Sequence, residues 1–129
     1  MANRFFSCPV EEDRVWQMLS YIELNPVRAG IRKHAWDWEW SSAKAHVTGL
    51  DPTGLLDMEL WRRHFDGAGW RDYLQRMAEE STFATRIRKA TTTGRFFGSE
   101  ATARRLELEQ GLTILPRKRG RKPKAHPGR

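Results

Sequence analysis

The sequence predicts a mainly α-helical protein that ends in a disordered basic tail. Apolar residues recur three and four positions apart near the N-terminus and again beyond residue 57, which is the spacing of a helix face. Residues that favour turns separate these stretches, most clearly over 49–54 and 91–94. Residues 116–129 hold seven Lys or Arg and no acid, so this segment cannot bury apolar surface and should be disordered.

The first helix is expected over residues 9–24. Pro9 suits a first helical position, and the acids at 11–13 place negative charge in the first turn. The core face should be an apolar stripe of three residues at spacings of four and three: Val15, Leu19 and Ile22. If the chain is part of a larger fold, this stripe is also the surface that would be left without its partner.

A polar stripe follows the same helix at spacings of three and four: Arg14, Gln17, Tyr21 and Asn25. Pro26 disfavours helical geometry at the residue before it, so the helix should end near Asn25. The Tyr21 hydroxyl and the Asn25 carboxamide are therefore expected close together on the last turn, where solvent reaches them.

The chain between residues 35 and 110 predicts further short helices. Residues 35–40 alternate as Ala-Trp-Asp-Trp-Glu-Trp, a strand-like period that is too short to decide the structure. A serine at 41 or 42 can cap a helix through about Val47. Other helices are expected over 57–65, 69–80 and 100–110, with 83–89 as additional helix and a break at 91–94. Six residues of the middle helices should face inward: Trp61, Phe65, Trp70, Tyr73, Leu74 and Met77.

Several exposed-looking side chains have two interpretations. Trp36, Trp38 and Trp40 can stack on nucleic-acid bases or pack against the first helix. Arg104 and Arg105 can contact DNA or form an ordinary solvated helix face.

Cys8 is the single cysteine, so no intramolecular disulfide is possible. The sequence has no long apolar run and no signal-peptide core, so we expect a soluble cytoplasmic protein.

Residues 21–30, Tyr-Ile-Glu-Leu-Asn-Pro-Val-Arg-Ala-Gly, together with Trp40-Ser-Ser-Ala43, resemble the signature of the REP-associated tyrosine transposases. These belong to the IS200-like group of single-tyrosine HUH transposases. The resemblance implies that the chain is the C-terminal helical part of an α+β HUH fold. It divides the chain into the end of the catalytic domain at 1–48, a helical C-terminal region at 49–115 and the basic tail at 116–129.

The resemblance also implies a chemistry. In that family the tyrosine attacks a DNA phosphodiester and forms a 5′-phosphotyrosine intermediate, which matches Tyr21, while Asn25 matches a ligand of Mg²⁺ or Mn²⁺. The two other ligands are an upstream His-hydrophobe-His pair, and the four histidines of this chain (34, 46, 64 and 126) never fall two apart. We therefore expect this chain alone neither to bind the metal nor to cleave DNA.

The basic tail indicates a polyanionic partner. Without it the chain has 16 basic and 16 acidic residues, so the formal charge of +7 resides in the tail. Affinity would come from counterion release at phosphates. Six residues are the expected DNA contacts: Arg117, Lys118, Arg119, Arg121, Lys122 and Lys124. The Arg119-Gly-Arg121 stretch also resembles the AT-hook core that enters narrow minor grooves, with Lys122 where that core has proline.

Two functional classes follow. The first is a transposase component acting on single-stranded or hairpin repeat DNA through Tyr21 and Asn25, with histidines supplied by an N-terminal half or a partner chain. The second is a non-catalytic DNA-binding protein that uses the tail and the C-terminal helices. A degenerate remnant without a role is a third possibility.

Overall fold

A computed structural model of the chain describes residues 7–116 and residue 120. These residues form helices and no β-strand, which confirms the mainly α prediction. The elements in chain order are η1 Glu12–Arg14, α1 Val15–Glu23, α2 Asn25–Arg28, η2 Ala35–Asp37, α3 Ala43–Thr48, α4 Met58–Arg62, α5 Gly67–Glu79, α6 Ser81–Thr93 and α7 Glu100–Gln110.

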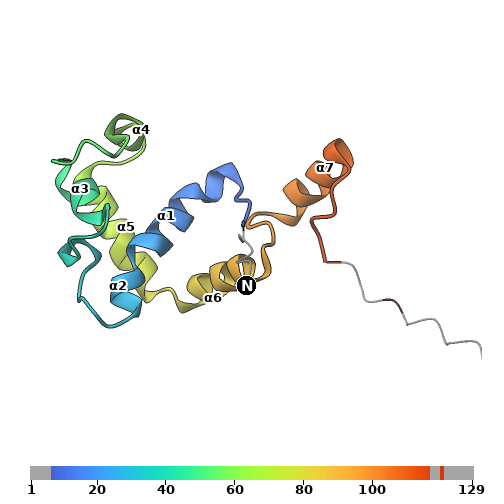
Figure 1. Ribbon diagram of the computed structural model, residues 1–129, viewed down its shortest axis with the longest axis horizontal. Helices are drawn as coiled ribbons and strands as arrows, with labels where there is room; N and C mark the ends of the chain where they lie inside the picture. Colours follow the sequence, from blue (N-terminus) through green and yellow to red (C-terminus); the bar gives the residue numbers. More distant parts are fainter. Residues whose placement is uncertain (1–6, 117–119, 121–129) are drawn as a thin grey trace, which may run out of the picture.

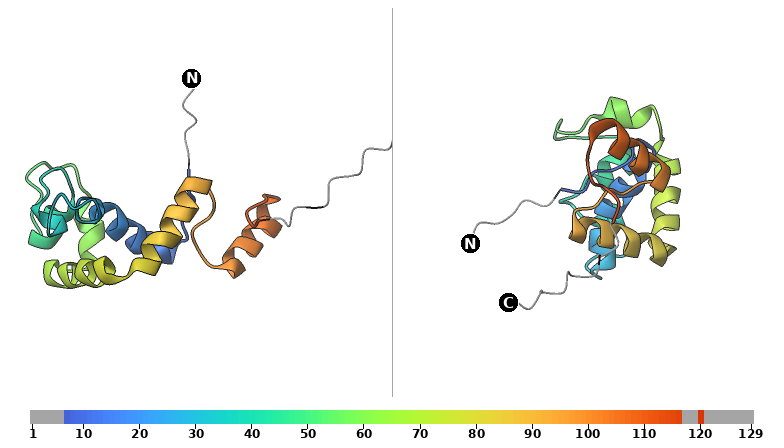
Figure 2. Two further views of the ribbon diagram at one scale, coloured as in Figure 1. Left: turned by 90° about the horizontal axis from the view of Figure 1, so that it is seen from below. Right: turned by 90° about the vertical axis from the view of Figure 1, so that its right-hand side faces the viewer.

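The helices form an elongated arrangement (Figures 1 and 2). The α3–α4 region lies at one end, α1 and α5 lie beside each other next to it, and α6 leads toward α7 at the other end. The left view of Figure 2 shows α7 standing apart from the other helices, reached by the segment that follows α6. How α7 is held in place is therefore a separate question from how the rest of the molecule packs.

The larger core lies between α1, α3, α4 and α5, and Trp70 is at its centre. The Trp70 side chain is fully buried, and its ring meets those of Trp16, Phe65 and Tyr73 at centroid distances of 4.8–6.3 Å. Trp61, Trp70 and Leu74 are buried here, while Phe65, Tyr73 and Met77 pack against them. The prediction that these six side chains face inward is confirmed.

A smaller core joins α6 to α1. Phe83, Ile87 and Ala90 share one face of α6 and pack with the buried Phe97. Met18 and Tyr21 of α1 lie against this second cluster. Tyr21 thus has a structural role at the crossing of α1 and α6, in addition to any chemistry of its hydroxyl.

The first helix begins later than the sequence predicted. Pro9 does not start it, because its carbonyl accepts the Phe97 N–H at 2.8 Å and the Glu11 N–H donates to the Phe97 carbonyl at 2.9 Å. These bonds hold residues 9–11 extended in a bridge between Val10 and Phe97, so α1 proper starts at Val15. It ends at Glu23, near the predicted end, but Pro26 falls in the first turn of α2, where its missing N–H costs no helix bond.

The predicted core face of this helix is wrong. Val15 and Ile22 are 45% and 54% exposed, and Leu19 alone of the stripe packs against the larger core. The buried positions are instead Ser20, Glu23 and Leu24. A carboxyl group is buried in preference to two aliphatic side chains because three donors from distant elements satisfy it. The expectation that the whole stripe is a surface without a partner does not hold for Leu19, and for Val15 and Ile22 it stays a prediction.

Other boundaries also differ from the predictions. Helix α5 starts at Gly67, two residues early, because the Asp66 carboxylate caps it by accepting the Gly69 N–H at 2.6 Å. Helix α6 runs through the three threonines and ends at Thr93, and the following Gly94 has a φ of 62° that suits glycine. Residues 35–37 form a 3₁₀ turn and not a strand. The cap at Ser99 and the helix over 100–110 are confirmed.

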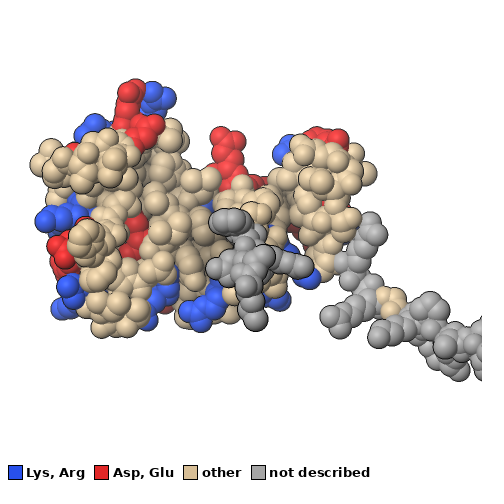
Figure 3. Space-filling view, viewed as in Figure 1, with Lys and Arg blue, Asp and Glu red and all other residues tan. Residues whose placement is uncertain are grey.

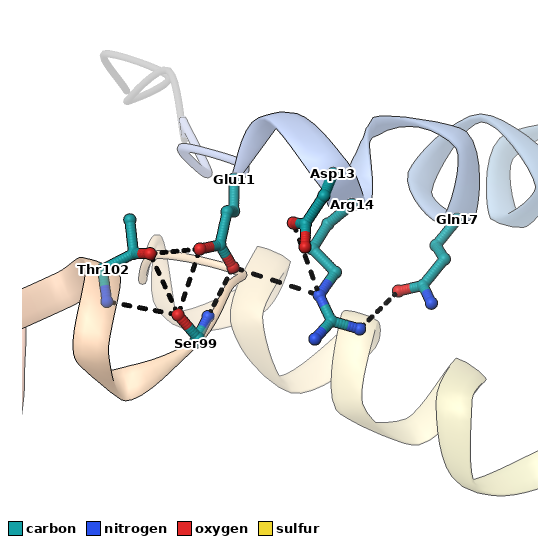
Figure 4. A network of polar contacts seen from close by, with 6 residues as sticks. All are labelled: Glu11, Asp13, Arg14, Gln17, Ser99 and Thr102. Atoms are coloured by element: carbon teal, nitrogen blue, oxygen red, sulfur yellow. Dashed lines mark hydrogen bonds and ion pairs between the residues drawn. The ribbon is translucent and has the colours of Figure 1, made fainter.

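A carboxylate latch connects α7 to the start of the chain (Figure 4). The Glu11 carboxylate accepts the Ser99 N–H at 2.7 Å, the Ser99 hydroxyl at 3.0 Å and the Thr102 hydroxyl. Arg14 approaches the same carboxylate at 4.0 Å. Hydrogen bonds from Thr102 and Ser99 lower the pKa of the Glu11 carboxyl below its ordinary value of 4.5.

The latch predicts a specific pH dependence of stability. Because the folded-state pKa of Glu11 is lowered, its contribution is fully present above pH 4.5 and is lost as the pH falls through the folded pKa. Glu11→Gln should be less stable than the parent at pH 7, and the gap should close in acid. Urea unfolding from pH 7 to pH 3 measures it, with Glu12→Gln at an exposed neighbouring site as the control. A gap independent of pH would contradict the latch.

Candidate nucleic-acid interface

Tyr21 lies where α1, α2 and α6 meet, half-buried and next to the exposed Asn25. Both residues are reached by one side chain, because Arg28 Nη2 donates to the Tyr21 carbonyl oxygen and to Asn25 Oδ1. Tyr21 is partly accessible, as predicted, but its side chain packs against the smaller core, and the contact with Asn25 runs through Arg28 and the Tyr21 backbone carbonyl rather than the hydroxyl.

Arg28 makes this site electropositive. Its guanidinium lies over the Tyr21 ring, with Cζ 3.8 Å from the ring centroid, a cation–π arrangement. Burial lowers the pKa of the Arg28 guanidinium, attraction to the Tyr21 phenol opposes that shift, and the positive charge of Arg88 on α6 adds to it. Arg88 is thus close enough to Arg28 to act on it electrostatically.

Helix α6 and the segment after it carry a basic surface that the charge analysis of the sequence missed. Residues 81–99 hold four cations and no acid: Arg86, Arg88, Lys89 and Arg95. All four side chains are exposed, whereas Phe83, Ile87 and Ala90 occupy the buried face of the helix. Blue atoms follow the lower edge of the molecule around α6 in Figure 3. The zero net charge of residues 1–115 concealed this stretch, which a charge count in a short sliding window would have found.

A groove of about 330 Å³ lies between α6 and α7. Arg86, Lys89 and Arg95 line it on the α6 side. Its apolar lining includes the half-buried Phe96, the buried Ala103 and, after α7, Ile114, Leu115 and Pro116. Glu100 also borders the groove, but its carboxylate is paired with Arg104 of the same helix. The groove therefore combines three cations with an apolar floor.

The segment after α7 is fastened along that helix. The chain leaves α7 at Gly111, and the Glu107 carboxylate then accepts the N–H groups of Ile114 and Leu115 at 2.6 and 2.7 Å. Ile114, Leu115 and Pro116 consequently border the groove. The predicted DNA contacts Arg117, Lys118, Arg119, Arg121, Lys122 and Lys124 lie outside the described residues, and the chain reaches them directly from the edge of the groove.

The two sequence segments that carry the transposase resemblance meet at a buried carboxyl group. Glu23 of the Tyr-Ile-Glu motif accepts the Ser42 hydroxyl through Oε1 and the Trp70 indole N–H at 2.9 Å through Oε2. His46 Nδ1 lies 2.6 Å from Glu23 Oε1. This network fixes the rotation of α1 against α3 and α5, and with it the face that presents Tyr21. Sequence reasoning missed Glu23 because a lone acid on a helix usually faces solvent.

The described residues contain no group of three or more His, Cys, Asp or Glu placed to hold a metal ion. The Asn25 carboxamide oxygen, the one matched ligand, accepts from Arg28. His46 is engaged by Glu23, and the His34 ring stacks on Trp36 with 4.8 Å between centroids. These residues do not fit a Mg²⁺ or Mn²⁺ site around Tyr21, so no step at Tyr21 is assigned to a metal.

The sequence allows the tryptophans either to stack on bases or to pack inward, and the arginines of α7 either to contact DNA or to form a solvated face. Trp36 packs against the larger core, as the packing interpretation predicted, whereas Trp40 is 79% exposed and free for a stacking contact. Arg104 pairs with Glu100 and Arg105 is exposed, so the orientation of α7 is compatible with a solvated face.

Within residues 7–116, no helix combines the length and apolar character needed to cross a membrane. Comparisons of the chain with protein-family models, curated proteins and solved structures gave no match. The relation to tyrosine transposases stays a prediction from the sequence.

Proposed function

We propose that this chain is a DNA-binding protein derived from the tyrosine-bearing part of an IS200-like transposase. One observation carries the proposal: positive charge extends from the half-buried Arg28 at the Tyr21 site along the exposed cations of α6 to the groove that Pro116 borders. Arg28 lies over the Tyr21 ring, Arg88 acts on Arg28 electrostatically from α6, and Arg86, Lys89 and Arg95 border the groove. Phosphates of a DNA strand would be bound along this path, with the tail supplying most of the affinity.

The experiment that tests the proposal is a salt titration of binding to a labelled hairpin oligonucleotide. If most of the seven tail cations meet phosphates, the tail contributes roughly −4 to −6 to the slope of log K against log salt. A chain ending at Pro116 should bind more weakly by orders of magnitude at low salt, with a shallower slope that reflects the α6 surface. Full affinity after this deletion would contradict the role of the tail, and absence of binding by the whole chain would overturn the proposed function.

A second candidate function is DNA strand cleavage with a covalent tyrosine intermediate. The observation in its favour is the half-exposed Tyr21 beneath a guanidinium that could offset charge on an attacked phosphate. A denaturing gel of the same binding reactions decides between the two functions. A protein–DNA adduct that Tyr21→Phe abolishes would establish cleavage, and binding without any adduct would support the non-catalytic function.

A further inference from the structure

We infer that the groove between α6 and α7 is a binding site for one nucleotide of single-stranded DNA, with its phosphate at Lys89 and its base over the apolar floor. This inference deepens the proposed function and rests on it. The sequence prediction placed DNA contacts on the tail and, in general terms, on the C-terminal helices, but it assigned no role to this groove.

The cations of the groove select an anion. Arg86, Lys89 and Arg95 are all exposed and line one wall, and Glu100, the one acid among the lining residues, forms an ion pair with Arg104. The chain's own residues 117–129 are a poor occupant, because they carry seven cations and no acid and would be repelled by this wall. A phosphodiester is the complementary group.

The apolar floor and the size of the groove select a nucleotide over a bare phosphate. Ala103, Ile114 and Leu115 face the space together with Phe96, so a purely ionic ligand would leave apolar surface uncovered. A volume of about 330 Å³ is at the lower end of the roughly 300–1,000 Å³ typical of small-molecule sites. It is large enough for a single nucleotide, whereas a base held in a duplex by pairing and stacking could not reach the floor. Single-stranded DNA presents unstacked bases that can leave the strand axis.

Two adjacent threonines supply a matched test of the groove itself. Thr92 and Thr93 are both exposed on the last turn of α6, and each donates its hydroxyl to the carbonyl four residues earlier. Thr93 lines the groove and Thr92 does not line it. Thr93→Phe should therefore fill the groove without changing charge, while Thr92→Phe makes the same change outside it.

Two lysines test the phosphate contact in the same way. Lys89 lines the groove, and Lys33, which is also exposed, lies in the loop before η2 and does not line it. Lys89→Gln should reduce the salt slope for single-stranded DNA by about 0.7 and weaken binding about five-fold at 0.1 M salt. Lys33→Gln should leave both values near those of the parent.

The experiment measures binding of the whole chain and the four variants to a fluorescent single-stranded oligonucleotide and to its duplex. Circular dichroism melting of each variant controls for folding. We expect Thr93→Phe and Lys89→Gln to weaken single-strand binding relative to their partners, and Thr93→Phe to leave duplex binding unchanged.

Three results would overturn the inference while leaving the proposed function standing. They are equal single-strand affinity of Thr93→Phe and Thr92→Phe, equal salt slopes of Lys89→Gln and Lys33→Gln, or parallel loss of duplex binding in Thr93→Phe. If the parent chain binds neither DNA form, the proposed function fails first, so the two failures are distinguishable.

Discussion

Replacing Glu23 with alanine is expected to lower the free energy of unfolding by about 3–5 kcal/mol. The substitution removes the acceptor of the Trp70 indole N–H and the Ser42 hydroxyl and the partner of His46, all in the largest core. Each buried group left without a partner costs about 1–3 kcal/mol. Chemical denaturation measures the loss, and near-ultraviolet circular dichroism reports the environment of Trp70.

Two control variants show whether the cost comes from the network. Glu23→Gln keeps the shape and one acceptor oxygen, so it should lose less stability than alanine does. Glu12→Ala removes an exposed acid in η1, the element before α1. Its free energy of unfolding should stay within about 0.5 kcal/mol of that of the parent. A parent-like free energy of unfolding for Glu23→Ala would show that the network does not hold α1 against α3 and α5.

Substituting alanine for Gly67 is the second change with a large expected effect. A Cβ atom at this position would lie 2.2 Å from the Val47 carbonyl oxygen, so α3 and the start of α5 would have to separate. Alanine gains up to about 1 kcal/mol in helix propensity. A clash with backbone cannot be relieved by a rotamer change and outweighs this gain, because overpacking costs typically about 1–3 kcal/mol and occasionally more. We expect a net loss of about 2 kcal/mol in the free energy of unfolding.

Gly69→Ala is the matched control for Gly67→Ala. The added Cβ there would meet the Asp66 carboxylate at 3.0 Å, a side-chain atom that can shift by a few tenths of an ångström. When thermal melts of the parent, Gly67→Ala and Gly69→Ala are compared, Gly69→Ala should therefore match the parent or exceed its stability. If both variants lose the same stability, the close approach of α3 and α5 is not what requires glycine at 67.

The sequence was sufficient for features that depend on local chemistry. The Ser99 cap, the helix it begins and the inward positions of Trp61, Trp70 and Leu74 follow from neighbouring residues and helical spacing, and each is present. The placement of Tyr21 beside Asn25 also follows from a spacing of four.

Features that depend on distant partners could not be predicted. Glu23 is buried because donors at positions 42, 46 and 70 converge on it, and no local pattern encodes that convergence. Pro9 misled the prediction of the first helix because its carbonyl pairs with Phe97, 88 residues away in the chain. The groove requires α6 and α7 to be placed relative to one another, and that placement depends on the Glu11 latch.

The bonds from Glu107 to Ile114 and Leu115 bear on how far the protein can reach. They fix the start of the basic tail at the groove, and the 13 residues beyond Pro116 can extend at most about 45 Å from that point. If DNA binds as proposed, a strand held by the tail would stay within that radius of the groove and of the α6 cations. Binding at the groove would then be an intramolecular event, with an effective concentration of the order of millimolar for a short linker. Under these conditions a weak site for a single nucleotide would be occupied without high affinity of its own.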